Sequence, residues 1–135
     1  MIIERSVVES MFAHAERDAP IEACGYLLGV DGRITRYYPM TNAEGREDHF
    51  AFDPEEQFAA YKAARHEGLE FIGAYHSHPV TPARPSAEDI RLLLDPSLLY
   101  VIVSLLDGAR AAKGFRIRDG KAEEEQLSIE ERALN

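Results

Sequence analysis

The chain has 135 residues, of which 45% are hydrophobic and 29% are charged, a composition typical of one globular domain with its own core. A formal net charge of −9 and a pI of about 5.0 argue against a nucleic-acid-binding surface, which needs basic patches. The single cysteine excludes an intrachain disulfide framework. We find neither a signal peptide nor an apolar run of about 20 residues, so we expect a cytoplasmic protein without a membrane partner.

Residues 6–18 have the spacing of an amphipathic helix that ends before Pro20. Ser6 and Glu9 have the spacing of a capping box, which predicts where this helix begins. His14 is expected to be exposed. The apolar face, which we expect to cover a sheet, consists of Val7, Val8, Met11, Phe12 and Ala15.

Two strands joined by a tight turn are predicted next. Residues 24–30 and 34–38 are the strand segments, and Asp31-Gly32 between them is typical of a two-residue hairpin turn. Cys24 has no basic neighbour that would lower its pKa, so we interpret it as a small buried hydrophobe and not as a nucleophile. The polar residues 40–48 predict an exposed loop, and the sequence leaves open whether this loop contacts a substrate.

A short strand at residues 49–52 precedes a second predicted helix. The helix begins with Asp53 as its N-cap and Pro54 at its first position, and Gly68 is expected to end it. The side chains expected to face inward are Phe58, Ala60, Tyr61 and Ala64.

The second half of the chain contains more strand patterns than helix patterns. An apolar strand at 71–75 leads through a loop to a helix at 87–94. Residues 98–106 are almost continuously apolar, as in a strand that is buried on both faces, and strands at 112–118 and 121–127 follow. Helices therefore punctuate a mixed sheet, which predicts a layered α/β domain.

One short segment carries the residues best suited to bind a metal. His76 and His78 are two positions apart on a strand, so their side chains point to the same face and can share one ion. Pro79 ends that strand, and Asp89 falls in the first turn of the next helix, where the helix dipole favours a carboxylate. Two histidines and one carboxylate leave a fourth tetrahedral position for water, as in catalytic zinc sites. Spacing alone does not decide whether Glu88 or Asp89 is the third ligand.

The segment from His76 to Asp89 has the pattern His76-x-His78-Pro79, followed by Ser86 and Asp89. Ten residues separate His78 from Asp89. This pattern resembles the signature of the JAMM (MPN+, JAB domain) zinc metalloprotease family, in its short prokaryotic branch. The resemblance spans residues 22–107. It implies the cytidine deaminase-like JAMM fold, a curved and mostly antiparallel sheet flanked by helices. We expect this domain to occupy residues 1–127 and to be followed by a C-terminal tail, 128–135, that frays or forms a short helix.

The resemblance also implies which residues act. Glu22 and the apolar strand after it are similar to the family's N-terminal segment, so Glu22 would be the general base for a zinc-activated water. Ser86 would donate a hydrogen bond to the oxyanion, although it is also the natural N-cap of the following helix, and one hydroxyl can serve both roles. Ser77 is expected to be structural, and Arg84 either meets a substrate or is solvated. The family's ligands for one Zn²⁺ per chain correspond to His76, His78 and Asp89.

The family resemblance implies a partner as well. Members cut the amide or isopeptide bond after the C-terminal Gly-Gly tail of ubiquitin-like or sulfur-carrier proteins, but no residue here identifies the carrier or decides between a monomer and a homodimer. Two alternatives are a non-catalytic MPN-type scaffold and a RadC-like protein. Scaffolds usually lose ligands that this chain keeps, and RadC-like proteins normally continue Pro-Ser-Gly where this chain has Pro79-Val80-Thr81.

Overall fold

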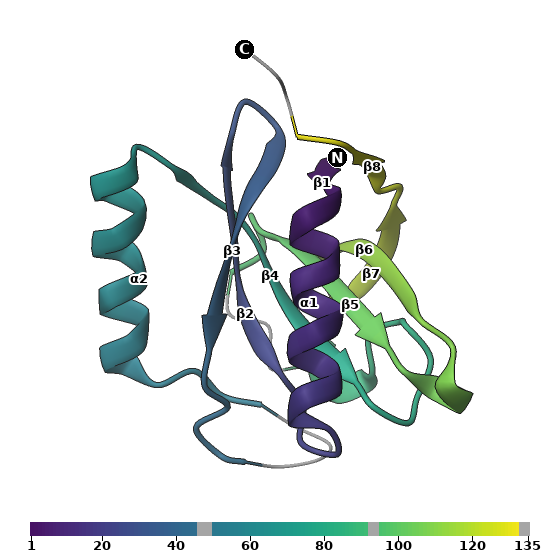
Figure 1. Ribbon diagram of the computed structural model, residues 1–135. Helices are drawn as coiled ribbons and strands as arrows, with labels where there is room; N and C mark the ends of the chain where they lie inside the picture. Colours follow the sequence, from purple (N-terminus) through teal and green to yellow (C-terminus); the bar gives the residue numbers. More distant parts are fainter. Residues whose placement is uncertain (46–49, 92–94, 133–135) are drawn as a thin grey trace.

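In the computed structural model, residues 1–45, 50–91 and 95–132 are described, and this part of the chain forms an eight-stranded sheet in the order β7-β6-β5-β4-β2-β3-β1-β8 (Figure 1). The pairs β4–β5, β1–β3 and β1–β8 are parallel and the other neighbours are antiparallel, which confirms the predicted mixed sheet. The strands are β1 (Ile2–Glu4), β2 (Cys24–Val30), β3 (Arg33–Met40), β4 (Glu70–His78), β5 (Leu99–Ser104), β6 (Ala111–Arg118), β7 (Lys121–Glu125) and β8 (Ser128–Glu130).

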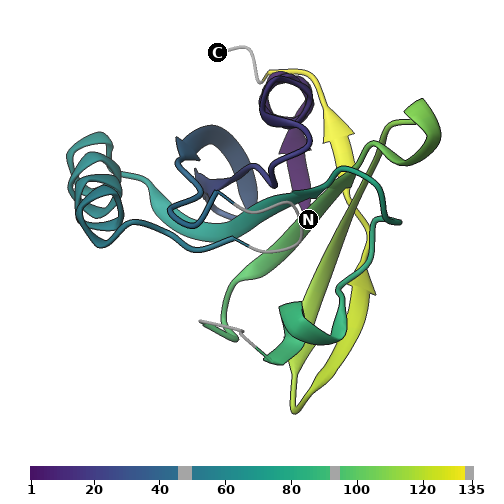
Figure 2. The same ribbon diagram turned by 90° about the horizontal axis from the view of Figure 1, so that it is seen from below.

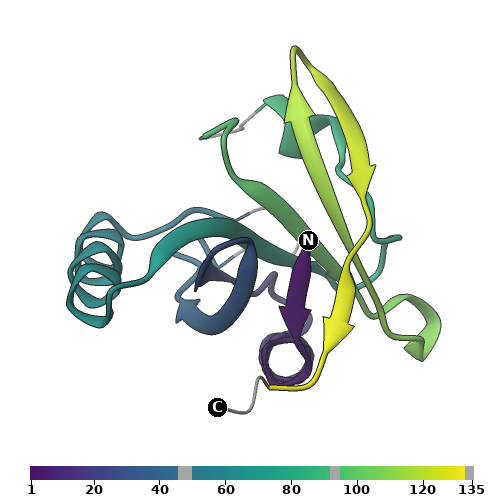
Figure 3. The same ribbon diagram turned by 90° about the horizontal axis from the view of Figure 1, so that it is seen from above.

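Helices cover both faces of the curled sheet (Figures 2 and 3). Helix α1 (Arg5–Asp18) lies on one face, where its predicted apolar residues pack against Leu27 of β2. Helix α2 (Pro54–Glu67) and the short α3 (Ala87–Arg91) contribute to a second core on the opposite face, which includes Tyr26 of β2. Successive residues of a strand point to opposite faces, so β2 serves both cores. A 3₁₀ turn, η1 (Leu106–Gly108), joins β5 to β6.

The predicted capping box of α1 is not formed. The N-cap is Glu4, whose side chain makes no capping hydrogen bond. The reason is that β1 runs directly into the helix and places Ser6 inside the first turn, one residue past the actual start.

His14 is 5% exposed, so the prediction that it would be exposed is wrong. Its Nδ1 atom is hydrogen-bonded to the hydroxyl groups of Tyr37 and Tyr75, and its Nε2 atom lies 2.9 Å from Asp18. Two tyrosines of the sheet thus provide polar partners under α1, where the pattern of apolar residues gave no sign of them. Burial lowers the pKa of His14, against the opposing effect of the Asp18 carboxylate.

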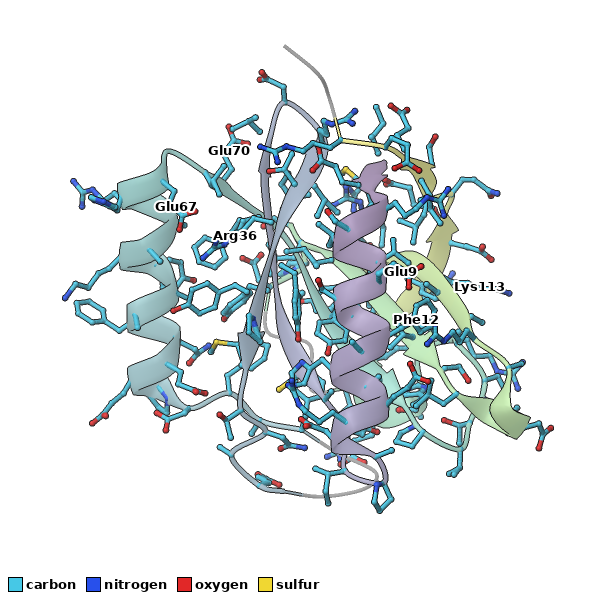
Figure 4. The ribbon with its side chains drawn as sticks, in the orientation of Figure 1. Glu9, Phe12, Arg36, Glu67, Glu70 and Lys113 are labelled. Atoms are coloured by element: carbon cyan, nitrogen blue, oxygen red, sulfur yellow. The ribbon has the colours of Figure 1, made fainter. Side chains whose placement is uncertain are left out.

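The ends of α2 are those that the sequence predicts. The Asp53 side chain accepts a hydrogen bond from the Glu55 N–H at 2.8 Å, and Gly68 ends the helix in the left-handed conformation with φ 70°. Near that end, Arg36 of β3 lies 3.4 Å from Glu67 of α2 (Figure 4). The pair is partly exposed, so it orients the two elements and adds little to stability.

The inward face of α2 is only partly as predicted. Ala60 and Ala64 are buried, but Phe58 and Tyr61 are 65% and 55% exposed. The helix approaches the sheet through small alanine side chains, and the larger aromatic residues remain outside the interface. The Tyr61 ring packs against the edge of the domain, with its centroid 4.4 Å from that of Phe71.

The hairpin and the buried central strand are confirmed. Asp31 and Gly32 have φ values of 51° and 73°, as a two-residue turn with both centres left-handed requires. Every residue of β5 is buried. Of the predicted strand at 49–52, Phe52 forms an isolated bridge to Asn42, while residue 49 lies outside the described residues, as do residues 92–94 of the predicted second-half helix.

The start of the C-terminal segment is a strand and not the frayed end or short helix that the sequence suggested. β8 pairs in parallel with β1, with Ile129 opposite Ile3. Arg33 of β3 strengthens this edge because it bonds to Glu4 at 3.2 Å and to Glu130 at 3.1 Å. The domain boundary at residue 127 remains a prediction. Among the described residues, none of the helices has the length and apolar character needed to cross a bilayer.

Candidate metal centre

Three side chains converge where β4 ends and α3 begins. The Nε2 atoms of His76 and His78 and the Oδ2 atom of Asp89 lie 3.1 Å from one another in every pair. His76 and His78 are 3% and 4% exposed, and the Asp89 side chain is 15% exposed. Together these three side chains form a group that can hold a metal ion. Asp89, and not Glu88, therefore completes the set.

The geometry of the three atoms fits a zinc ion. Zinc–nitrogen and zinc–oxygen distances of about 2.0–2.1 Å place tetrahedral ligand atoms about 3.3 Å apart, because the edge of a tetrahedron is about 1.6 times its centre-to-corner distance. The observed separations of 3.1 Å are close to this value. The donor set of two imidazoles and one carboxylate is that of open catalytic zinc sites.

The orientation of His78 is fixed by the loop after β4. Its Nδ1 atom lies 2.9 Å from the carbonyl oxygen of Pro82, which can only accept, so Nδ1 carries the proton and the Nε2 lone pair faces the other ligands. Burial alone would lower the pKa of His78, but the adjacent Asp89 carboxylate and the Pro82 carbonyl favour the protonated ring, outweigh burial and raise the pKa.

His76 is more deeply enclosed. Its ring stacks on Phe50, with centroids 4.8 Å apart and an interplanar angle of 25°. Burial lowers the pKa of His76 despite the opposing hydrogen bond to Asp89, and this favours the neutral imidazole that a metal requires.

Asp89 is held by the first turn of α3. The Ser86 N–H donates to Asp89 Oδ2 at 2.9 Å, and the Asp89 N–H donates to Ser86 Oγ at 3.0 Å. This reciprocal pair is a capping box with aspartate as its acidic member, so the expected capping role of Ser86 is confirmed. Burial alone would raise the pKa of Asp89, but the adjacent imidazoles of His76 and His78 hold it well below its ordinary range.

Glu22 lies beside these ligands. In the antiparallel β2–β4 register Cys24 pairs with His76, and extending that register by two residues puts Glu22 opposite His78 on the same face. Glu22 is 5% exposed, and its charge acts to raise the pKa of His78. The structure therefore brings all five residues of the expected site to one end of the sheet.

The backbone around Glu22 is anchored on both sides. The Ala23 N–H donates to Ser77 Oγ at 2.8 Å, and the Ser77 N–H donates to the Ala23 carbonyl at 2.9 Å. The Asn42 side-chain amide donates to the Glu22 carbonyl at 3.1 Å. Ser77 thus has the structural role that its place on the other strand face predicts.

Other residues singled out from the sequence take no such place. Cys24 is fully buried, and burial raises its pKa to about 12, so it cannot supply a thiolate nucleophile. Arg84 is exposed, and its contact with a substrate stays a prediction. Thr41, at the start of the predicted loop, bonds to the Glu56 carboxylate through both its N–H and its hydroxyl at 2.8 Å.

Sequence reasoning missed the ring of Phe50, the carbonyl of Pro82 and the side chain of Asn42. A backbone carbonyl has no sequence signature, so Pro82 could not have been found. The aromatic residues at 50 and 52 are a signal, but their alternation predicts only a short strand and indicates no link to His76.

The chain matches the family described as prokaryotic homologs of the JAB domain over residues 4–118. The CysO-cysteine peptidase of Mycobacterium tuberculosis H37Rv is 39% identical over 134 residues, which cover 97% of this chain and 92% of that protein. The desampylase of Haloferax volcanii is 36% identical over 104 residues, covering 71% and 74%. The solution structure of protein DSY2949 from Desulfitobacterium hafniense superposes with a TM-score of 0.89 at 43% identity, covering 98% of this chain and 94% of that one.

These similarities extend over nearly the whole domain and agree with the geometry of the site. The mixed sheet and the three α-helices of the described residues form the α/β JAB/MPN fold that the sequence resemblance implied. The metal-binding group sits on the residues that carry the JAMM signature. The chain therefore belongs to the prokaryotic JAB (JAMM) family of zinc metallopeptidases.

Proposed function

We propose that this protein hydrolyses the amide or isopeptide bond that follows the C-terminal Gly-Gly of a ubiquitin-like or sulfur-carrier protein. The observation that carries the proposal is the triangle of ligand atoms, each 3.1 Å from the other two, on the sheet face that also holds Glu22. His76, His78 and Asp89 would hold one zinc ion per chain.

The proposed reaction needs a base and a proton carrier. A zinc ion in such a site lowers the pKa of water toward about 7 and polarises a carbonyl group. Glu22 takes a proton from the attacking water and returns it to the leaving amine as the carbon–nitrogen bond breaks. Its burial beside His78 supports this role, because a carboxylate shielded from bulk water keeps the proton at the site for the second transfer.

Ser86 is the proposed donor to the oxyanion of the tetrahedral intermediate. Its Oγ lone pair accepts the Asp89 N–H at 3.0 Å, which leaves the hydroxyl proton available. The capping bond thereby orients the hydroxyl, and Ser86 lies at the exposed mouth of the site, where a substrate carbonyl can approach.

The proposed substrate class rests on the relatives and on the chemistry of a Gly-Gly tail. The M. tuberculosis relative is named for CysO-cysteine, and the H. volcanii relative is named a desampylase. Two glycines offer no side chains, so such a tail is recognised through its backbone, as an extended segment beside a sheet. This mode leaves either a C-terminal amino acid or a lysine side chain as the leaving group.

The experiment measures zinc content and cleavage in the same preparations of wild type and of a His76→Ala/His78→Ala variant. Two substrates are used, a carrier ending Gly-Gly-Cys and a carrier joined through Gly-Gly to a lysine side chain. We expect one zinc per wild-type chain, cleavage of at least one substrate, and loss of both zinc and cleavage in the variant. Zinc without cleavage would refute the substrate class, and a wild-type chain that binds no zinc would favour the non-catalytic scaffold.

A further inference from the structure

The loop between β4 and α3 is tied down on both sides of Pro82. On one side, the Ser104 hydroxyl donates to the Thr81 carbonyl at 2.5 Å. On the other, the Ala83 side chain is buried in a small cluster with Ile102 and Phe115. The residue whose carbonyl meets His78 is therefore placed by the two residues that flank it.

Proline makes this arrangement necessary. Pro82 has no N–H to donate and its side chain is exposed, so its carbonyl oxygen is its one hydrogen-bonding group. Its carbonyl accepts from His78 Nδ1 at 2.9 Å and also from the Arg84 N–H at 2.9 Å. A shift of the loop at Thr81 would therefore move the acceptor that fixes the His78 ring.

Ser104 is well placed to hold Thr81. It is the last residue of β5, it is 3% exposed, and it pairs directly with His78 in the parallel β4–β5 ladder. Its Oγ accepts the Leu106 N–H at 3.1 Å, so its proton is committed to the Thr81 carbonyl. The next residue, Leu105, donates its N–H to the His78 carbonyl at 3.2 Å. One strand end thus fixes both the backbone of His78 and the loop that orients its ring.

We propose that Ser104 is a positioning residue for the metal centre. By holding the Thr81 carbonyl it places the Pro82 carbonyl so that His78 stays protonated at Nδ1 and presents its Nε2 lone pair to the metal. The inference rests on the proposed zinc site, but it concerns a residue outside the proposed ligands and reacting groups.

The test uses variants that differ in the hydroxyl group alone. Ser104→Thr keeps the donor, and Ser104→Val has nearly the same shape without it, so a comparison of these two cancels the effect of the added volume. Ser104→Ala removes the hydroxyl without adding volume. Ser97→Ala is the matched control, because the Ser97 hydroxyl bonds to Asp95 in an exposed turn at 2.6 Å.

Two quantities are measured. The zinc affinity is measured by competition with a chelator. The His78 tautomer is measured by long-range ¹H–¹⁵N NMR of the metal-free protein, at a pH where imidazoles are neutral. We expect Ser104→Val and Ser104→Ala to lose about 10- to 100-fold in zinc affinity and to show a mixture of His78 tautomers. Ser104→Thr and Ser97→Ala should remain close to wild type in both measurements.

Two results would overturn the inference. One is equal zinc affinity in Ser104→Thr and Ser104→Val, and the other is weaker zinc binding with the His78 tautomer unchanged. The tautomer is measured without metal or substrate. A wild-type protein that failed to bind zinc or to cleave a carrier would therefore refute the proposed function and still leave the role of Ser104 open to measurement.

Discussion

Replacement of Glu22 by glutamine separates proton transfer from metal binding. The two side chains have nearly the same shape, and the hydrogen bonds that anchor this segment involve backbone atoms of Glu22 and Ala23, so the fold should be unaffected. A positioned general base contributes about 100- to 10,000-fold to rate, equivalent to about 2.7–5.4 kcal/mol of activation free energy. Glu22 is only 5% exposed, so buffer bases cannot easily replace it, and we expect a loss in kcat/KM near the middle of that range.

The assay compares wild type, Glu22→Gln and the control Glu88→Gln, each with its zinc content measured before kinetics on a Gly-Gly-tailed carrier. The control removes a carboxylate that neighbours Asp89 in the chain and pairs with Arg91 at 3.6 Å. Loss of the Glu22 charge beside His78 should weaken zinc binding by about 10- to 100-fold at most. The reasoning would be refuted if zinc-loaded Glu22→Gln kept kcat/KM within about tenfold of wild type, or if its activity fell only in proportion to lost zinc.

Three further predictions concern the metal and the stability of the sheet. His78→Ala should lower zinc affinity, measured by chelator competition, by more than about 100-fold, because it removes a ligand and not merely an outer contact. A zinc affinity close to that of wild type would exclude His78 as a ligand. Gly73→Ala should lower the free energy of unfolding, measured in urea, by about 2 kcal/mol. The reason is that a Cβ at this position would lie 2.5 Å from the Leu99 carbonyl oxygen and force β4 away from β5. Unchanged stability would show that the strands can separate freely. The pKa of His14 is lowered from 6.5 in the folded state by burial, against the effect of Asp18, so its contribution to stability is fully present above about pH 6.5 and is lost as the pH falls toward the folded pKa. Wild type should therefore lose more unfolding free energy than His14→Gln between pH 7.5 and 5.5, and equal losses would contradict this assignment.

The parts of the site that the sequence could predict are local in the chain. The spacing of His76 and His78 fixes a shared face in any strand, and Ser86 with Asp89 fixes a helix start, so both features follow from backbone geometry. The link between Glu22 and this segment is not local. It came from family resemblance, because a lone glutamate before a strand has the same local pattern in a solvated loop.

The errors arose where partners come from distant elements. His14 looked like an exposed helix residue because its tyrosine partners lie on β3 and β4, outside any local window. Phe58 and Tyr61 have the spacing of an inward face, but the helix packs through alanines, and the distance between helix and sheet decides which side chains fit. Hydrophobic periodicity predicts which side of a helix is apolar and does not predict how closely that side approaches its neighbour.

The alternation along β4 explains why the metal ligands stay in register. Tyr75 and Ser77 point to the face opposite His76 and His78, and both are fully buried. Each has its own polar partner there, Tyr75 in the hydroxyl network around His14 and Ser77 at the Ala23 backbone. A slip of one residue would carry the imidazoles into the core under α1 and leave those partners buried without their bonds. The polar contacts on the far face thus specify the register that brings the two histidines together, so the sheet positions the site before any metal binds.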